Sequence, residues 1–116
     1  EHCVTASYYN SIGVVYKRMG IYKVAFHYYN KSLETRLNVL GNKHIDTATS
    51  YNNIGIVYQT KGDYESALDY CNKSLQIRLK VLGNEHTDTA ASYNNIGSIH
   101  EKKGDYESAL DYYNKT

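Results

Sequence analysis

Apolar and small residues recur along the chain at alternating three- and four-residue spacings, the pattern of amphipathic helices. The first such stripe consists of Ala6, Tyr9, Ile12, Gly13 and Tyr16. No segment of the sequence alternates polar and apolar residues as a half-buried strand does. The pattern therefore predicts an all-α protein.

The same pattern returns after 42 residues. Segments 43–74 and 85–116 share 22 of 32 residues, so they are copies of one unit, and a diverged copy occupies residues 1–42. A period of about 40 residues indicates stacked helical units rather than one globular core. We expect one array over residues 1–116, with repeat one at 1–42, repeat two at 43–84 and repeat three at 85–116, the last with a truncated second helix.

Each repeat is predicted to be a pair of helices joined by a tight turn. Glycines such as Gly62 favour the left-handed conformation that ends a helix, and Asp63 and its copy Asp105 are placed to cap the next one. Repeat one lacks this cap, because Ile21 stands there. At the junctions between repeats, residues 44–47 and 86–89 predict an acidic or hydroxyl cap for the following helix.

A glycine lies inside the first helix of every repeat. An interior glycine costs about 1 kcal/mol relative to alanine, so its return predicts the close approach of a neighbouring helix. These glycines are Gly13, Gly55 and Gly97. Cys71 stands where the other repeats have Tyr29 and Tyr113, and we expect it to fill a packing position.

One set of residues in repeat two follows a familiar order: Tyr51, Ile54, Gly55, Tyr58, Gly62, Tyr64, Ala67 and Leu75. This order resembles the tetratricopeptide repeat, and the 42-residue length and the Val-Leu-Gly-Asn-x-His-x-Asp-Thr-Ala junction resemble its kinesin light chain branch. The resemblance implies an α-solenoid, a right-handed superhelix of antiparallel helix pairs whose first helices line a concave groove for peptides or partner helices.

Paired asparagines in the first helices are the leading candidates for that groove. They are Asn52 with Asn53 and Asn94 with Asn95, and Asn10 is the diverged copy. An amide offers donors and an acceptor, which suits it to hold the backbone of an extended peptide. The alternative is that these amides bond to the neighbouring helix or to solvent.

Helix geometry extends the predicted peptide-binding surface by one turn beyond the asparagines. Lys17 and Arg18 would attract an acidic peptide at one end. The further candidate residues are Val14, Lys17, Ile56, Gln59, Ser98 and Lys102.

Two arginines, Arg36 and Arg78, follow the apolar stripe of the second helix. We expect structural roles for them, with stems packed and each guanidinium reaching a carboxylate at the next junction, such as Asp46 or Asp88.

Charge and chemistry exclude several classes of function. Thirteen basic and twelve acidic residues give a net charge of +1, without the excess expected of a binder of nucleic acid or membrane surfaces. His2, His44 and His86 occur once per repeat, too far apart for one zinc ion. Cys3 and Cys71 occupy non-equivalent positions and suggest no disulfide. We expect no enzyme activity, metal or cofactor.

No apolar run reaches the ~18 residues of a membrane span, and no charged-then-apolar leader opens the sequence. We therefore expect a soluble, cytoplasmic protein.

Two functions remain open at this point. The first is a scaffold that binds a peptide or partner helix in the groove, with the partner's identity unspecified. The alternative is a structural spacer, or an array that self-associates end to end through exposed repeat ends.

Overall fold

The computed structural model describes residues 3–115, which form helices joined by short turns and contain no strand. His2 and the side chain of Cys3 lie outside the described part. The all-α prediction is confirmed, and the chain is an α-solenoid. The helices are α1 (Cys3–Arg18), α2 (Tyr22–Leu40), α3 (Ile45–Lys61), α4 (Tyr64–Leu82), α5 (Thr87–Lys103) and α6 (Tyr106–Tyr113).

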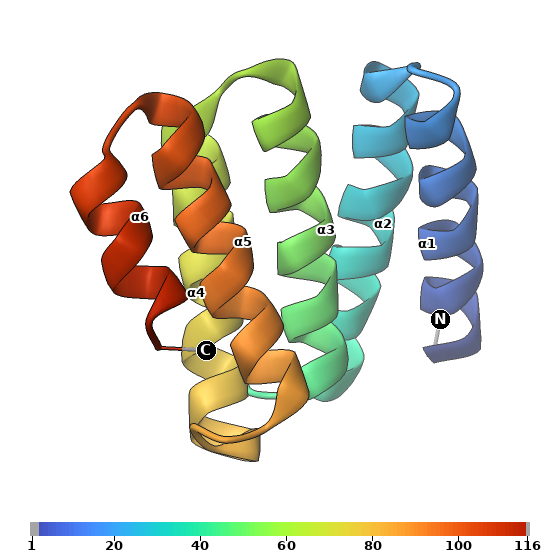
Figure 1. Ribbon diagram of the computed structural model, residues 1–116. Coiled ribbons are helices and arrows are strands. Elements are labelled where there is room, and N and C mark those ends of the chain that lie inside the picture. The colour runs from blue at the N-terminus through green and yellow to red at the C-terminus, as the bar shows by residue number, and fades with distance from the viewer. Residues whose placement is uncertain (1–2, 116) are drawn as a thin grey trace.

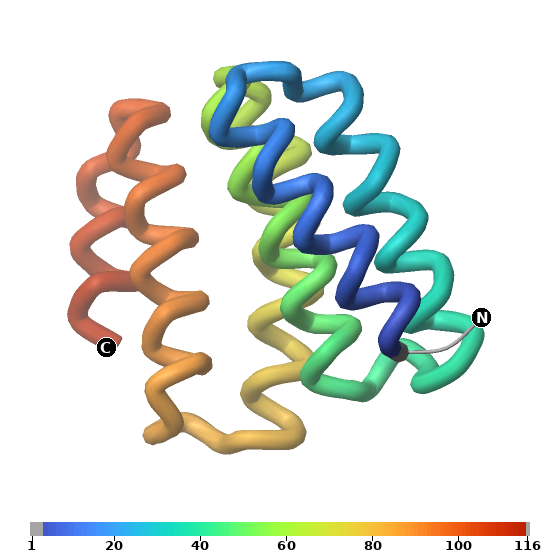
Figure 2. The backbone as a smooth tube through the Cα atoms, turned by 90° about the vertical axis from the view of Figure 1, so that its right-hand side faces the viewer, coloured from blue at the N-terminus to red at the C-terminus, as the bar shows by residue number. Residues whose placement is uncertain are grey.

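The helices form three antiparallel pairs that stack in sequence order (Figure 1). Each helix packs against the next one along the chain, and α3 also contacts α5. The first helices α1, α3 and α5 therefore lie side by side, and the second helices form another layer (Figure 2). The molecule measures 42 × 32 × 18 Å, so it is a thin slab with broad faces and two narrow ends.

The turns inside the repeats follow the sequence prediction. Gly62 and Gly104 take φ of 91° and 89°, a left-handed conformation that a side chain would strain. The carboxylates of Asp63 and Asp105 then accept hydrogen bonds from the backbone N–H groups of residues three positions later, at 3.3 Å. Ile21 makes no side-chain cap.

The junction caps differ from the prediction. Histidine, not an acidic or hydroxyl residue, caps α3 and α5, because the Nδ1 atoms of His44 and His86 accept from the N–H groups of Asp46 and Asp88 at 3.0 Å. The junction threonine does not cap its helix, because Thr47 Oγ1 donates a hydrogen bond to the backbone carbonyl of Gly41 at 2.8 Å. An extended backbone at the cap lets the imidazole turn back onto the first helical turn.

The interior glycines are sites of close helix contact, as predicted. A Cβ atom on Gly55 would lie 2.6 Å from the Cys71 sulfur and 3.2 Å from the Ala67 carbonyl oxygen. Gly13 and Gly97 face the rings of Tyr29 and Tyr113 equally closely. Cys71 is completely buried, and burial raises its pKa from 9.0 to about 11, so it is an inert packing residue.

The two arginines join successive repeats, but not through carboxylates. Arg36 Nη1 donates to Ser50 Oγ at 2.8 Å and to the backbone carbonyl of Asp46 at 3.1 Å. Arg78 repeats this geometry with Ser92 Oγ at 2.7 Å. The expected structural role is confirmed and the expected carboxylate partner is wrong, because a serine on the inner side of the next helix lies closer to the buried guanidinium.

A ring from the second helix lies between two rings of the first helix in each repeat. The ring centroid of Tyr70 lies 6.1 Å from that of Tyr51 and 5.6 Å from that of Tyr58, on which it stacks. In repeat three, His100 takes the place of the second tyrosine and stacks on Tyr112 at 5.4 Å. These sandwiches fix the angle between the helices of a pair and give most tyrosines a structural role.

Candidate functional site

The predicted binding residues all lie on α1, α3 and α5, which adjoin one another in the stack. Asn52 is buried with 9% exposure, and Asn94 and Lys102 are exposed. The remaining residues, all half-buried, are Asn10, Val14, Lys17, Asn53, Ile56, Gln59, Asn95 and Ser98.

The asparagines bond to one another between repeats. Asn53 Nδ2 donates to Asn10 Oδ1 at 2.6 Å, and Asn95 Nδ2 donates to Asn52 Oδ1 at 3.0 Å. In both pairs the second asparagine of one repeat meets the first position of the repeat before it. The amides therefore form a ladder across the first helices, so the bond to a neighbouring helix that the sequence left open is present.

Each rung leaves part of its hydrogen-bonding capacity unused. Asn10 accepts at Oδ1 and keeps the hydrogens of its Nδ2, while Asn53 keeps its Oδ1. In the described part of the chain, the buried side-chain polar atoms without a partner belong to Ser74 and His100. The unused asparagine atoms are therefore not sealed in the core. The rungs can therefore bond both to each other and to a third group.

A second line of contact lies one to two turns further along the helices. Gln59 Nε2 donates to Ser98 Oγ at 3.1 Å and joins α3 to α5. The corresponding positions between α1 and α3 are Lys17 and Ile56, which form no such bond. The surface is thus basic and apolar near repeat one and amide- and hydroxyl-rich near repeat three.

Several predicted residues are not joined to the others. Asn94 has no polar partner within residues 3–115, and neither do Lys17 and Lys102. Val14 and Ile56 contribute only apolar surface. These residues are available at the edges of the ladder, whereas the paired amides hold its centre.

Sequence reasoning missed two features of this surface. It compared the asparagines within one repeat, whereas the bonded partners are 43 residues apart, one more than the period. It also missed the bond from the Tyr113 hydroxyl to Glu101 Oε1 at 2.8 Å, which ties α6 to the edge of the surface. This bond to a carboxylate raises the pKa of Tyr113. Asparagines that lie 43 residues apart, one more than the period, were the signal in the sequence that could have predicted the ladder.

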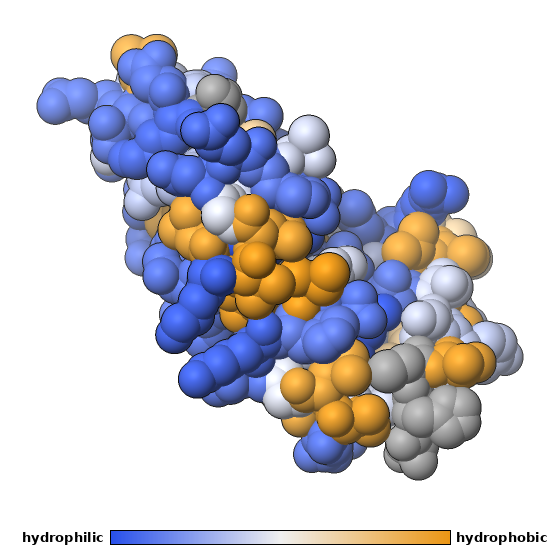
Figure 3. All heavy atoms as spheres, turned by 90° about the horizontal axis from the view of Figure 1, so that it is seen from below, coloured by the Kyte–Doolittle hydropathy of each residue, from blue (hydrophilic) through white to orange (hydrophobic). Residues whose placement is uncertain are grey.

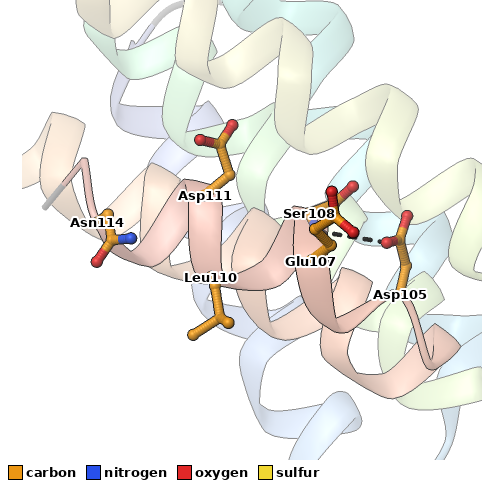
Figure 4. A pocket seen from close by; sticks show the side chains of 6 residues that line it. All are labelled: Asp105, Glu107, Ser108, Leu110, Asp111 and Asn114. Atoms are coloured by element: carbon orange, nitrogen blue, oxygen red, sulfur yellow. Dashed lines mark hydrogen bonds between the residues drawn. The ribbon is translucent and has the colours of Figure 1, made fainter.

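Other site chemistries find little support in the described residues. Within residues 3–115, no group of three or more His, Cys, Asp or Glu side chains could hold a metal ion. A hollow of about 590 Å³ lies along α6, where Asp105, Glu107, Leu110 and Asp111 surround it (Figure 4). It is an open, largely acidic surface at one end of the stack, away from the amide ladder.

None of the helices described between residues 3 and 115 has the length and apolar character needed to cross a membrane.

Solved structures share this architecture. BtubC (BKLC) from P. vanneervenii is 24% identical with a TM-score of 0.89, over 95% of this chain and 44% of that one. A kinesin light chain protein of Podospora anserina with nearly identical TPR-like repeats is 18% identical with a TM-score of 0.87, over 99% and 55%. The N-terminal domain of stress-induced protein-1 from C. elegans is 19% identical with a TM-score of 0.75, over 95% and 80%.

These likenesses concern the fold, and the chain spans about half the length of the first and second of these proteins. No curated protein is significantly similar to it in sequence. The sequence model of the tetratricopeptide repeat, by contrast, matches residues 4–70 and 52–116, nearly the whole chain. Together with the stacked helix pairs and their interior glycines, this match confirms the resemblance seen in the sequence: the chain belongs to the tetratricopeptide repeat family.

Proposed function

We propose that this chain is a protein-interaction module that binds an extended peptide or a partner helix across the surface formed by α1, α3 and α5. Repeats of this family generally mediate protein–protein interaction, and the finer assignment to this surface is ours. The observation that carries it is the amide ladder, in which each rung retains a donor or an acceptor after pairing.

An unused amide is suited to a peptide backbone. Every residue of an extended peptide other than proline offers one N–H and one C=O that need partners. Asn53 Oδ1 matches the first group and the Nδ2 of Asn10 matches the second. Because both groups are already fixed by pairing, little side-chain entropy is lost when they bind a ligand.

The edges of the ladder supply selectivity. Lys17 lies at the end of α1 and favours an acidic residue of the ligand, while Val14 and Ile56 offer apolar contact beside it. At the other end, Ser98 and Gln59 present polar atoms. A ligand with an acidic or apolar segment at one end and a polar segment at the other fits this gradient.

The test uses random dodecapeptides displayed on phage and selected on the intact chain. A selected peptide is then measured by calorimetry against wild type and the double variant Asn53→Ala/Asn95→Ala. Loss of two hydrogen bonds is expected to weaken binding about tenfold or more. The matched control is Asn30→Ala/Asn38→Ala, which removes two exposed amides from α2 and should leave affinity unchanged.

Equal affinity of wild type and the ladder variant would place the peptide elsewhere and refute the proposed site. The alternative function, a spacer without a groove ligand, predicts that selection yields no peptide that competes for this surface.

A further inference from the structure

A hollow of about 200 Å³ lies between the junction of repeats one and two and the second half of α4. A second hollow of about 300 Å³ adjoins it, because Asn42, Gln76 and Ile77 line both. We call the two together the junction hollow, and its other lining residues are Lys43, Tyr51, Lys73 and Lys80. All of these residues lie in the middle of the chain, and none belongs to the amide ladder.

The copies of the repeat differ at this hollow and agree around it. Segments 30–42 and 72–84, which end the second helices and lead into the next repeat, share 10 of 13 residues. The three differences all line the hollow, and one of them, Ile77, is only 8% exposed, so divergence there is not confined to side chains in solvent. In these three places Gln76, Ile77 and Lys80 replace Glu34, Thr35 and Asn38.

Every change of charge at the hollow makes repeat two more basic than its sister repeats. Gln76 stands where repeat one has a glutamate, and Lys80 stands where it has an asparagine. Lys43 stands where both other repeats begin with glutamate, Glu1 and Glu85. Within residues 3–115, no acidic side chain lines the hollow.

Lys43 is placed against the local electrostatic preference. It directly precedes His44, the N-cap of α3, where the positive end of the helix dipole favours an acidic side chain. Lys80 lies in the last turn of α4, where a basic side chain is favoured. Helix stability therefore explains Lys80 but not Lys43, and a residue that breaks a local rule indicates a functional surface.

The ammonium groups of Lys43 and Lys80 are exposed, and neither forms an ion pair or hydrogen bond with another residue of 3–115. Lys73 is already engaged, since its Nζ lies 3.6 Å from an Asp69 carboxylate oxygen and 5.7 Å from the ring centroid of Tyr51. Like charges gathered at one hollow repel each other, and an anion bound between them removes that repulsion. The hollow therefore has unmatched positive charge.

The size of the hollow limits the kind of anion. A bilayer surface or a nucleic acid duplex requires a broad basic face, whereas the net charge of the whole chain is only +1. The side of the molecule at which successive repeats join carries separate apolar patches among hydrophilic side chains (Figure 3). A hollow of about 200 Å³ in such a surface admits a few side chains of a peptide.

We propose that the junction hollow binds an acidic segment of a partner protein. Aspartate or glutamate carboxylates of that segment pair with Lys43 and Lys80, and an aliphatic side chain beside them packs on Ile77. The amides of Asn42 and Gln76 bond to the backbone of the segment. This contact is separate from the groove formed by α1, α3 and α5 and does not depend on it.

The test selects random dodecapeptides displayed on phage in parallel on wild type and on Lys43→Glu/Lys80→Asn. Both substitutions install the residue of a sister repeat, so the variant should fold, which circular dichroism checks. Lys43→Gln/Lys80→Gln replaces it where it does not. Peptides retained by wild type and lost on the variant should be enriched in aspartate and glutamate.

One such peptide is then measured by calorimetry. Its affinity for the variant should be about tenfold weaker or less, and its affinity for wild type should fall as salt is added. The matched control is Lys23→Glu/Lys61→Asn, which makes the same change in net charge with two exposed lysines at the opposite ends of their helices. This control should bind like wild type. The ladder variant Asn53→Ala/Asn95→Ala should do so too, which separates this site from the proposed groove.

Peptide pools that do not differ between wild type and the hollow variant would refute the proposal, and so would a difference without enrichment of acidic residues. Equal weakening by the matched control would also refute it, because net charge rather than the hollow would then attract the peptide. Tighter binding of wild type to phosphatidylserine vesicles or to duplex RNA than to the selected peptide, lost in the hollow variant, would assign the site to another class of partner.

Discussion

Asn53 donates from Nδ2 to Oδ1 of Asn10 at 2.6 Å, across the boundary between repeats one and two. The bond recurs between Asn95 and Asn52 at 3.0 Å. The Tyr-Asn-Asn-Ile-Gly segment, for which the sequence left ligand binding and a bond to the neighbouring helix both open, therefore holds the first helices in register. The amides that join the helices are also the ones that we propose for peptide binding, which ties the shape of the surface to the groups that it presents.

Replacing Asn53 by alanine is expected to destabilise the chain. The change removes the bond to Asn10 and should lower the free energy of unfolding by about 0.5–1.5 kcal/mol, measured by urea denaturation. Asn94→Ala is the control, because it removes another asparagine from the same Tyr-Asn-Asn-Ile-Gly segment of a first helix, one that has no polar partner in residues 3–115. Equal losses for the two variants would contradict a stabilising role for the rung.

Replacing Ser92 by alanine should cost more, because Ser92 is completely buried and accepts from the Arg78 guanidinium at 2.7 Å. Burial lowers the pKa of Arg78, as expected of a charge that depends on its few acceptors. We expect a loss of about 1–3 kcal/mol in the free energy of unfolding. In an Arg78→Met background the same change should cost far less, since no guanidinium is left unpaired.

Ser74→Ala provides the control for this cycle. Ser74 is as buried as Ser92, but its hydroxyl has no hydrogen-bond partner in the described structure, so alanine should be neutral or stabilising there. A similar loss for Ser74→Ala and Ser92→Ala would mean that the arginine bond adds nothing beyond burial.

Periodicity predicted the helices, their turns and the packing glycines, because each of these depends on residues of the same repeat. Gly62 and Asp63 act within one turn of the chain, and each interior glycine meets the same position of the second helix, which is Cys71 for Gly55 and a tyrosine in the other two repeats. The acceptor of Arg36 was mispredicted because carboxylate and serine are both within its reach, and only the relative position of two helices decides between them.

The sequence placed the asparagines on the first helices, as the structure does, but it did not predict which of them bond to each other. Asn52 and Asn53 point in different directions on one helix, and their bonds go to opposite neighbours, α5 and α1. These bonds require that successive first helices are offset, so that the second asparagine of one repeat faces the first position of the repeat before it. The offset is set by how the repeats stack, and the sequence of one repeat does not reveal it.

Gly55→Ala should destabilise the array although alanine favours helix more than glycine does. The new Cβ atom would lie 2.6 Å from the buried Cys71 sulfur, and moving that sulfur disturbs the core. Overpacking of this kind costs about 1–3 kcal/mol, more than the ~1 kcal/mol gained in helix propensity. Thermal denaturation followed by circular dichroism measures the difference.

Cys71→Ala supplies the compensating change for Gly55→Ala. Removing the sulfur opens the space that the new methyl group needs, so Gly55→Ala should cost less in this background than in wild type. Part of the cost should remain, because the Ala67 carbonyl oxygen still lies 3.2 Å away. An identical cost in both backgrounds would show that sulfur contact does not explain the glycine.

The buried Cys71 thiol should resist alkylation in the folded chain. Its pKa of about 11 leaves almost no thiolate at neutral pH, and the side chain is completely buried. In a Cys3→Ser background, iodoacetamide labelling followed by mass spectrometry should be slow in buffer and fast in denaturant. Rapid labelling of the folded chain would contradict the packing role.

The same thiol should make stability depend on pH in a defined window. The unfolded thiol begins to ionise near its ordinary pKa of 9.0, whereas the folded thiol stays neutral up to about 11. The unfolded state therefore loses its proton first, and stability is constant below pH 9, falls between about 9 and 11, and levels off above. The shift corresponds to a loss of about 3 kcal/mol. Tyrosines titrate in the same range, so the test is the difference in the free energy of unfolding between wild type and Cys71→Ala, measured by urea denaturation at each pH.

Alanine removes a packing group and lowers stability at every pH, but the difference in free energy between the two proteins should narrow as the pH rises from 9 to 11. A gap that stays constant would show that the sulfur is not held neutral by burial.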